Sequence, residues 1–400
     1  MAVDELLERG VEKILPSRKD LEEKIKSKDR LNVYLGIDPT ATKIHLGHTV
    51  GLRKLQKFAE LGHNVTFLIG DFTALIGDTS DKETERPILT KEEIEENFKT
   101  YAKQAGKILD FSKIKIIHNS EWLNKLNLEE ILKLAQNFSL SDFIGRELIK
   151  RRLDSGKRVG LHELLYPIMQ GYDSYMLDTD LQIGGEDQEL NMQAGRILQK
   201  KLKNQESLVL ITELLAGTDG KKMSKTSNNV IWIDDNPVDM YAKVMAIYDE
   251  LIPQFFKLAT NLPLSEVSEI ENQLKSTKNP MDIKKRLALQ ITEELHGKDE
   301  AHKAQEHFEN VFQKQKNPFE IPPFFIPEKE ADLATIADII HSAGLVKSKA
   351  QAKRVIQQGG TTINNQLVRD PNDQFSKYIV QNQAIIKIGK KNFVKVTTKS

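Results

Sequence analysis

The stretch that decides the fold runs from residue 31 to residue 69 and reads LNVYLGIDPTATKIHLGHTVGLRKLQKFAELGHNVTFLI. Two apolar runs, Leu31–Ile37 and Val65–Ile69, predict short buried strands. Between them apolar residues recur at helical spacing from Leu46 to Leu61, and Gly62 is a favourable helix terminator. Strand, helix and strand within about forty residues predict a βαβ unit with a right-handed crossover, and therefore a parallel sheet.

The rest of the first half extends this pattern. Further strands are predicted at Ile114–Ile117, Leu181–Ile183 and Leu208–Thr212, with helical stretches between them. One of these helices opens with a capping box formed by Thr90 and Glu93. Alternating strands and helices over the first 215 residues predict an α/β fold with a doubly wound, Rossmann-like parallel sheet. Ligands of such folds bind beyond the carboxyl ends of the strands.

Downstream, the composition changes twice. Residues 236–316 are helical in pattern and charged, and a proline-dense stretch at 318–327 predicts an extended linker. From Leu333 to the end there are 11 basic and 3 acidic residues, a net charge of +8 that leaves the preceding part at −8. A basic tail on an acidic body is typical of a protein that holds a polyanion. The expected division is therefore a catalytic domain at 1–220, a lysine-rich loop and helical domain at 221–316, a linker at 317–332 and a basic α+β domain at 333–400.

Composition also excludes several classes of protein. The chain contains no cysteine, which excludes disulfides and thiolate metal sites and suits a reducing compartment. Its beginning lacks the basic and apolar regions of a signal peptide, and no apolar run approaches the length of a membrane span. The expectation is a cytoplasmic protein.

The first motif lies where the predicted strand ends and the helix begins. It consists of Gly36–Thr40 followed by His45-Leu46-Gly47-His48. The N-terminus of a helix attracts anions, Gly47 permits close approach to the backbone, and two imidazoles three residues apart can donate to phosphate oxygens. The alternative is a pair of surface histidines beside a helix cap. A zinc site is a weaker interpretation of the two histidines, because the sequence offers no third ligand near them.

The second motif is Gly220–Ser227, which reads GKKMSKTS and follows the last predicted strand. Lysines separated by small and hydroxyl residues can surround a polyphosphate and neutralise charge on a leaving group. A basic solvated turn is the alternative.

The third motif is a polar stripe in an apolar helix. Tyr166, Gln170 and Asp173 fall at i, i+4 and i+7, which places them on one helix face. A buried phenol, amide and carboxylate are costly unless a partner satisfies them. That partner is either a polar ligand or an internal hydrogen-bond network.

Together these motifs resemble a known family. His45–His48 and Lys222–Thr226 resemble the paired His-Ile-Gly-His and Lys-Met-Ser-Lys-Ser motifs of class I aminoacyl-tRNA synthetases, with Leu46 and Thr226 as conservative departures. The segment around Tyr166 and the block Gln182–Gln188 resemble the bacterial tyrosyl-tRNA synthetases, and the resemblance covers the whole chain.

This resemblance implies roles for individual residues. Tyrosine would be held by Tyr34, Thr73, Asp78, Tyr166, Gln170, Asp173 and Gln188. The adenosine of ATP would be lined by Gly36, Asp38, Gly47, His48 and Asp187, with Thr40 and His45 at the γ-phosphate. A mobile clamp on pyrophosphate would consist of Lys82, Arg86, Lys222, Lys225 and Thr226.

The implied reaction is the activation of L-tyrosine by ATP to tyrosyl-adenylate and pyrophosphate, followed by transfer of tyrosine to the 3′ end of tRNA(Tyr). No side chain need act as a nucleophile, so catalysis would rest on positioning and electrostatic stabilisation. Magnesium would enter with ATP, held mainly by its phosphates, and no metal site built from protein ligands is expected.

The resemblance also implies partners. The tail resembles a small RNA-binding module first recognised in a ribosomal protein, with Ser348 as the N-cap of a basic helix, a strand at Thr361–Ile363 and a hairpin from Ala384 to Val396. Its expected RNA contacts are Lys347, Lys349, Lys353 and Arg354. Residues from about 119 to 160 correspond in the family to an insertion that forms a homodimer.

Three alternatives stay open at this point. A tryptophanyl-tRNA synthetase shares the fold and both ATP motifs, although Tyr34 with Asp173 suits a phenol better. A smaller nucleotidyltransferase would not need the two further domains. An inactive RNA-binding paralogue would be expected to have lost histidines or clamp lysines, which this chain retains.

Overall fold

The computed structural model describes residues 2–28, 30–40, 42–78, 89–144, 147–223, 229–277, 279–313, 321–380, 382–389 and 392–399. The chain divides into two compact units, Met1–Ala301 and His302–Ser400, and each is described by itself. The finer division of the first unit into a catalytic and a helical domain stays a prediction.

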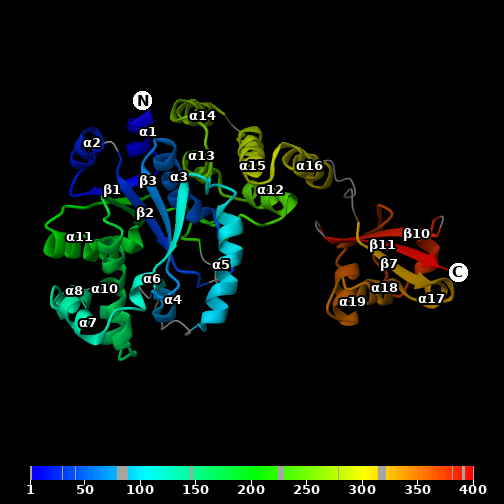
Figure 1. Cartoon of the computed structure of the whole chain (residues 1–400). Coiled ribbons are helices and arrows are strands. Elements are labelled where there is room, and N and C mark those ends of the chain that lie inside the picture. The colour runs from blue at the N-terminus through cyan, green and yellow to red at the C-terminus, as the bar shows by residue number, and fades with distance from the viewer. Residues whose placement is uncertain are drawn as a thin grey trace. The chain divides into compact units, whose positions relative to one another are not determined.

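The first unit is built on a six-stranded sheet with the order β1-β6-β5-β2-β3-β4 (Figure 1). Five strands are parallel and confirm the predicted ones, namely β2 (Asn32–Ile37), β3 (Asn64–Ile69), β4 (Ile114–His118), β5 (Leu181–Gly185) and β6 (Leu208–Thr212). The strand β1 (Val11–Leu15) was not predicted and runs antiparallel to β6. Of its five residues only Ile14 is buried, so it lacks the apolar run that marks the central strands.

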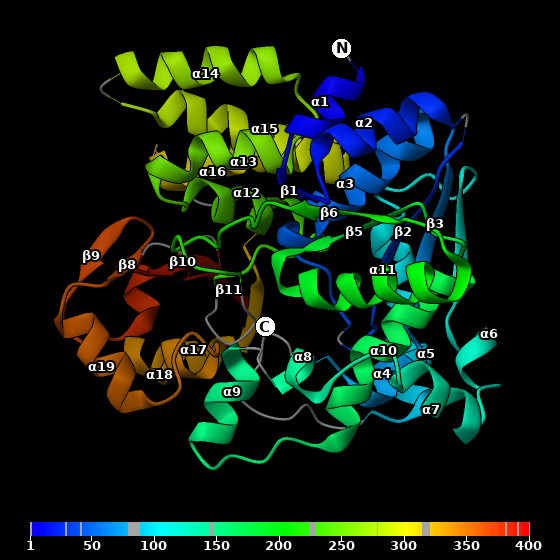
Figure 2. The ribbon, with the colours of Figure 1, turned by 90° about the vertical axis from the view of Figure 1, so that its left-hand side faces the viewer.

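Helices cover both faces of this sheet. The crossover helices α3 and α11 leave in opposite directions along the strand order, so right-handed connections place them on opposite faces (Figure 2). The helices of this half are α1 (Ala2–Glu8), α2 (Arg18–Ser27), α3 (Leu46–Glu60), α4 (Thr73–Ile76), α5 (Lys91–Ala105), α6 (Ser120–Leu123), α7 (Leu128–Ala135), α8 (Leu140–Ile144), α9 (Glu147–Asp154), α10 (Leu161–Met176), the 3₁₀ turn η1 (Glu186–Gln188) and α11 (Glu189–Lys203). The predicted capping box of Thr90 and Glu93 opens α5.

The register of the strands collects the residues that follow them at one edge. Ile37 lies opposite Ile69, and Ile69 lies opposite His118, so β2, β3 and β4 end together. On the other side β5 and β6 end together at Gly185 and Thr212. This carboxyl edge is where a doubly wound sheet binds its ligands.

Beyond the sheet the first unit is helical, as predicted. Its helices are α12 (Pro237–Met245), α13 (Ile252–Ala259), α14 (Leu264–Ser276), α15 (Met281–His296) and the beginning of α16 (Lys298–Phe308). The segment before α12 is hydrogen-bonded to the start of α3: Leu46 N–H donates to Ile231 C=O at 3.0 Å, and Ile233 N–H donates to Ile44 C=O at 3.0 Å. The chain just after the lysine-rich loop is thereby paired with the chain just before α3.

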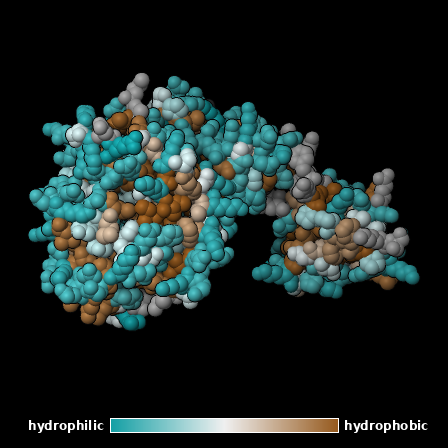
Figure 3. Space-filling model, in the orientation of Figure 1, coloured by the Kyte–Doolittle hydropathy of each residue, from teal (hydrophilic) through white to brown (hydrophobic). Residues whose placement is uncertain are grey.

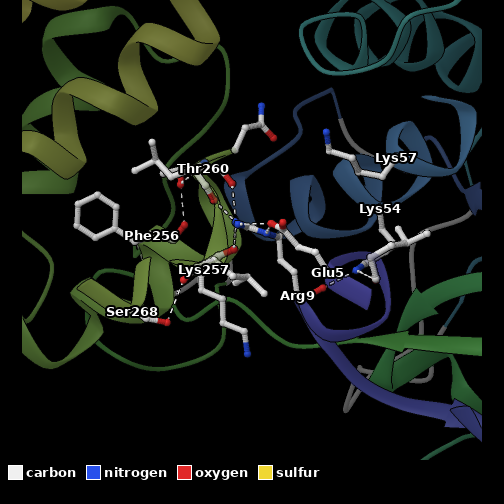
Figure 4. Close-up of polar contacts among 12 residues, drawn as sticks. Glu5, Arg9, Lys54, Lys57, Phe256, Lys257, Thr260 and Ser268 are labelled. Atoms are coloured by element: carbon white, nitrogen blue, oxygen red, sulfur yellow. Dashed lines mark hydrogen bonds and ion pairs between the residues drawn. The ribbon is translucent and has the colours of Figure 1, made fainter. Parts of the chain in front are cut away.

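The N-terminal helix ties α3 to α13 (Figure 4). The Arg9 guanidinium donates to the carbonyl oxygens of Lys257 at 2.9 Å and Thr260 at 3.2 Å. The buried ammonium group of Lys54, on α3, donates to the carbonyl oxygens of Leu6 and Arg9 at the end of α1. A cation here satisfies carbonyl groups that the end of a helix leaves unpaired.

Lys54 should make stability depend on pH. Burial, and then the charge of Arg9, lowers the pKa of Lys54 from 10.5 to about 7. Between these values the unfolded chain binds more protons than the folded one, so the contribution of Lys54 to the free energy of unfolding rises with pH. We expect the stability of the wild type relative to Lys54→Met, measured by urea unfolding, to increase from pH 7 to pH 10. Lys57→Met, at an exposed position three residues on, should show no such trend; a pH-independent difference for Lys54→Met would contradict the assignment.

The second unit is a five-stranded sheet with the order β7-β11-β10-β8-β9, packed against three helices. Its strands are β7 (Pro323–Pro327), β8 (Thr361–Ile363), β9 (Gln366–Val368), β10 (Gln383–Ile388) and β11 (Asn392–Lys399), and its helices are α17 (Glu328–Leu333), α18 (Ile336–Ser342) and α19 (Lys349–Gln357). Ser348 caps α19, and β10 pairs with β11 as a hairpin, as predicted. The structure differs from the predicted linker at 317–332: β7 pairs with β11, and Ile326 and Ala331 enter the core. A strand rich in proline is tolerated because β7 lies at the edge of its sheet.

Candidate active site

The turn from β2 to α3 holds two histidine rings against the start of the helix. His45 is the N-cap of α3, and its Nδ1 accepts a hydrogen bond from Gly47 N–H at 3.1 Å. The Nδ1 of His48 accepts one from His45 N–H at 3.2 Å, and the two ring centroids lie 3.8 Å apart. A Cβ at position 47 would lie 2.9 Å from the His45 ring, so the glycine lets the ring fold over the helix end.

Both rings are neutral at physiological pH. Burial, followed by the nearby His48 and Lys222, lowers the pKa of His45 to about 2. Burial also lowers the pKa of His48 to about 4. Because each Nδ1 accepts a hydrogen bond, the ring proton is assigned to Nε2. Each ring therefore offers one uncharged N–H donor, which suits a phosphate oxygen on which negative charge develops.

Asp38, just after β2, is the acceptor for two side chains from other elements. Tyr166 OH, on α10, donates to its Oδ2 at 2.9 Å, and Thr73 Oγ1, at the start of α4, donates to its Oδ1 at 2.8 Å. A Cβ at Gly70 would lie 2.0 Å from Asp38 Oδ1, so only glycine admits the carboxylate there. Burial, then Asp38 and Asp78, raises the pKa of Tyr166, which stays a neutral donor.

Asp173 lies in the same network and is buried. Asn119 Nδ2 donates to its Oδ2 at 3.1 Å and Trp122 Nε1 donates to its Oδ1 at 2.7 Å. Asn119 Nδ2 also donates to Thr73 Oγ1 at 3.0 Å, which connects Asp173 to Asp38. Burial raises the pKa of Asp173 to about 8, although the two donors act in the opposite direction.

Tyr34 lies on β2 in the apolar cluster that also contains Trp122. Its hydroxyl donates to Gln182 Oε1 at 3.0 Å, and Gln182 Nε2 donates to Met192 C=O at 3.0 Å. Burial raises the pKa of Tyr34, and the charge of Asp173 raises it further. The phenol is thus a fixed, neutral group beside the carboxyl group of Asp173.

Several acceptors face the same region from α10 and the loop after α4. Gln170 Oε1 is buried and has no hydrogen-bond partner among the described residues. Asp78 Oδ2 accepts a hydrogen bond from Gln188 Nε2 at 2.6 Å, and Asn191 Nδ2 donates to Gln188 Oε1 at 3.0 Å. A buried acceptor without a donor is costly, so this set is suited to a ligand that supplies N–H groups.

The lysine-rich loop begins beside the histidines. Lys222 Nζ lies 3.8 Å from Asp187 Oδ2, and its charge contributes to the lowered pKa values of His45 and His48. Asn229, which follows the loop, donates to Lys222 C=O at 3.1 Å and to Asp219 Oδ1 at 2.7 Å. The two ends of the loop are thereby joined next to the site.

The structure describes most of the residues predicted to bind tyrosine and ATP, and places them on β2 and the turn after it, on α4 and α10, and around the ends of β3, β5 and β6. This group comprises Tyr34, Gly36, Asp38, Thr40, His45, Gly47, His48, Thr73, Asp78, Tyr166, Gln170, Asp173, Asp187, Gln188 and Lys222. Lys82, Arg86, Lys225 and Thr226 lie outside the described residues, and the clamp on pyrophosphate, Lys222 included, stays a prediction.

Sequence reasoning missed Asn119 and Trp122. Both fall at the beginning of the stretch expected to form a dimer, whereas the structure places them against Asp173. Their place in the sequence could have indicated a role in the site. Both follow soon after a predicted strand, and the site residues of such folds lie after the carboxyl ends of the strands.

Within the described residues no group of three or more His, Asp or Glu side chains is arranged to hold a metal ion. Among the helices that the structure describes, none combines the length and apolar composition needed to cross a lipid bilayer.

Comparison with known proteins defines the family. Residues 26–313 match the family described as tRNA synthetases class I (W and Y), and residues 316–396 match the SYY-like C-terminal domain of tyrosine–tRNA ligases. The chain therefore belongs to the class I tRNA synthetases. Within that class it groups with the tyrosine–tRNA ligases: it is 41% identical to that of Photobacterium profundum over 98% of both chains, and 42% identical to that of Haemophilus influenzae over 98% of this chain and 95% of the relative.

Solved structures of tyrosyl-tRNA synthetases share the fold of this chain. A tyrosyl-tRNA synthetase from Archaeoglobus fulgidus, complexed with L-tyrosine, superposes with a TM-score of 0.61 at 25% identity, covering 76% of this chain and 99% of that chain. A C-terminally truncated mitochondrial tyrosyl-tRNA synthetase from Aspergillus nidulans shares the fold with a TM-score of 0.65 at 24% identity, covering 78% of this chain and 94% of that chain.

Proposed function

We propose that this chain activates L-tyrosine with ATP and transfers it to the 3′ end of tRNA(Tyr) in the cytoplasm. The observation that carries the proposal is the buried network around Asp38 and Asp173, which lies beside a histidine pair suited to phosphate. Tyr34 and Asp173 would bind the phenolic hydroxyl of tyrosine. Its ammonium group would be bound by Asp78, Tyr166 and Gln170, whose Oε1 needs a donor.

In the proposed reaction the tyrosine carboxylate attacks the α-phosphate of ATP, a P–O bond forms, and the bond to pyrophosphate breaks. Neutral N–H groups of His45 and His48 would stabilise charge on the phosphates without losing a proton. Asp187 and Asp38 would bind the adenosine. Asp38 also accepts a hydrogen bond from Tyr166, which is proposed to bind tyrosine, so Asp38 would connect the two substrate sites. Lys222 would neutralise the departing pyrophosphate. Magnesium would screen the phosphate charges, and the ATP phosphates rather than protein side chains would hold it.

Esterification of tRNA tests this proposal directly. Incubation with ATP, magnesium, tRNA and labelled amino acids should yield tyrosyl-tRNA and no tryptophanyl-tRNA. Charging with tryptophan would keep the fold and overturn the assignment of Tyr34 and Asp173, and absence of charging by folded protein would favour an inactive RNA-binding paralogue.

The second unit is proposed to bind RNA through α19. Lys347, Lys349, Lys353 and Arg354 are exposed, and Lys349 lies 2.8 Å from Asp338 in an ion pair. Replacing Lys353 and Arg354 with alanine should weaken tRNA binding and reduce the slope of log K against log salt by about 1 to 2, as expected for the loss of two phosphate contacts. Binding titrations at several salt concentrations measure this slope. Lys377→Ala is the control, because that exposed lysine is engaged by Asp373, and an equal effect from the control would contradict the assignment.

We propose a homodimer formed through the region from about residue 119 to residue 160, where apolar side chains are exposed at and beside this stretch (Figure 3). Leu128 is 71% exposed, Leu140 62% and Leu161 82%, and these side chains lie on α7, α8 and α10. Large apolar side chains left exposed in this way are typical of an interface. Leu128→Asp with Leu161→Asp should convert the dimer into monomers in sedimentation experiments. Leu333→Asp, at a residue 83% exposed in the second unit, should leave the dimer intact; a wild type that sediments as a monomer would contradict the proposal.

A further inference from the structure

A carboxylate outside the tyrosine pocket joins the two turns that build it. Asp71 follows β3, and its Oδ1 accepts a hydrogen bond from Ser120 N–H at 3.0 Å. Its Oδ2 accepts one from Ser120 Oγ at 2.6 Å and lies 3.1 Å from His118 Nδ1. We propose that Asp71, together with His118 and Ser120, is a positioning cluster that sets the geometry of the tyrosine pocket. The proposal rests on the function proposed above and assigns a new role to residues that touch no substrate.

The residue between His118 and Ser120 is Asn119, and it is fully buried. Its Oδ1 accepts from Phe72 N–H at 3.0 Å, and its Nδ2 donates to Thr73 Oγ1 at 3.0 Å and to Asp173 Oδ2 at 3.1 Å. Its own N–H donates to Ile69 C=O at 3.0 Å. Both polar groups of this side chain are hydrogen-bonded. A shift of the Asn119 backbone would therefore move with it the side-chain amide that donates to Thr73 and Asp173.

Asp71 contacts the residues on both sides of Asn119, through the ring of His118 and through the backbone N–H and hydroxyl group of Ser120. The hydrogen bond to Ser120 N–H fixes the peptide plane that follows Asn119, and the contact with the His118 ring restrains the residue before it. Hydrogen bonds weaken steeply as their angles change. Without the carboxylate, the turn after β4 loses the side-chain acceptor that joins it to the turn after β3 and keeps its pairing to β3, the hydrogen bonds of the Asn119 side chain and that of Trp122. A small displacement of this turn would lengthen the bonds to Thr73 and Asp173 together.

The cluster also has a connection toward the ATP side. The Phe98 ring, on α5, packs edge-on against His118 with centroids 4.8 Å apart. From the neighbouring position Asn97 Nδ2 donates to Pro39 C=O at 2.9 Å, in the turn between Asp38 and Thr40. The tie to the tyrosine pocket is made by direct hydrogen bonds and the tie to this turn only by ring packing, so the effect on tyrosine should dominate.

Asp71 can be replaced without disturbing the hydrophobic core, because its side chain is partly exposed to solvent. Its side chain is 24% exposed and that of His118 is 35% exposed, so Asp71→Ala opens no sealed cavity. The chain also contains a matched control. At the other end of β4, Asp110 Oδ1 accepts from Ser112 N–H at 3.0 Å and from Ser112 Oγ at 2.6 Å, which is the same pair of contacts far from the pocket.

The kinetic test compares Asp71→Ala with Asp110→Ala in tyrosine-dependent ATP–pyrophosphate exchange by the full-length protein. For Asp71→Ala we expect the KM for tyrosine to rise about tenfold, the factor that a single net hydrogen bond contributes, with the KM for ATP changed less than about twofold. The preference for tyrosine over phenylalanine should fall as well. Ser120→Thr, which keeps the hydroxyl group, should restore what Ser120→Ala loses. Asp110→Ala should leave all these values unchanged.

A spectroscopic readout makes the test independent of activity. The chain has two tryptophans, so Trp232→Phe leaves Trp122, whose Nε1 donates to Asp173, as the only source of tryptophan emission when tryptophan is excited selectively. In that background Asp71→Ala should shift the emission of Trp122, and Asp110→Ala should not. If the wild type fails to exchange with tyrosine, the proposed function is wrong, and the emission of Trp122 still decides the positioning role. If Asp71→Ala matches Asp110→Ala in both readouts, or changes both KM values equally, Asp71 is not a positioning residue.

Discussion

Replacing Asp173 with alanine should lower kcat/KM for tyrosine about a thousandfold and abolish most of the preference for tyrosine over phenylalanine. The side chain is buried and accepts from Asn119 and Trp122. The substitution removes the acceptor for the phenolic hydroxyl and leaves two buried donors unpaired, at about 1 to 3 kcal/mol each. A loss of about 4 kcal/mol corresponds to a thousandfold change. Steady-state ATP–pyrophosphate exchange with both amino acids measures it.

Asp180→Ala is the matched control for this prediction. Asp180 is also buried, but it pairs with Lys24 and Lys28 at the other end of β5. Its loss should reduce the free energy of unfolding without changing the ratio of tyrosine to phenylalanine activation. Unchanged kinetics for tyrosine in Asp173→Ala would remove Asp173 from the pocket.

Replacing His45 with asparagine should lower kcat for adenylate formation about a hundredfold or more and leave the KM for tyrosine nearly unchanged. The reason is that a neutral donor aimed at developing phosphate charge typically contributes about 3 kcal/mol to the transition state. Asparagine is a good N-cap, so this variant keeps the cap of α3 while it loses the Nε2 donor. Single-turnover formation of tyrosyl-adenylate separates this effect from product release.

His45→Ala separates the two functions of the residue. It loses both cap and donor, and should therefore add a loss of about 1 kcal/mol in the free energy of unfolding to the same kinetic defect. If His45→Asn were as active as the wild type while His45→Ala were not, the ring would act only as a helix cap, and its role at the phosphate would be contradicted.

The sequence predicted the fold wherever a local signal was strong. The five parallel strands are rich in apolar residues, and Thr90 and Ser348 are the N-caps of α5 and α19, as predicted. The strand β1 was not predicted because Glu12 and Lys13 interrupt its apolar residues, whereas the other edge strand, β4, keeps three isoleucines among its five residues. The stretch at 317–332 was read as a linker because prolines dominate it, yet β7 gains its stability from pairing with β11, which follows it by about 70 residues, a distance that local patterns do not report.

In the candidate site, too, local sequence patterns predicted the residues that lie on one element and missed those brought together from distant parts of the chain. Tyr166, Gln170 and Asp173 were found from their spacing on one helix, since i, i+4 and i+7 share a face in any α-helix. Asn119 and Trp122 contact Asp173 across more than 50 positions of sequence, and only the pairing of β3 with β4 brings them there. The neutral state of the histidines depends likewise on burial, which no motif encodes.

The most direct test of the central claim is ATP–pyrophosphate exchange with each of the twenty amino acids in the presence of magnesium. The network around Asp173 and the neutral histidine pair predict exchange with tyrosine alone. Exchange with tryptophan, or no exchange with any amino acid from protein shown to be folded, would contradict the account.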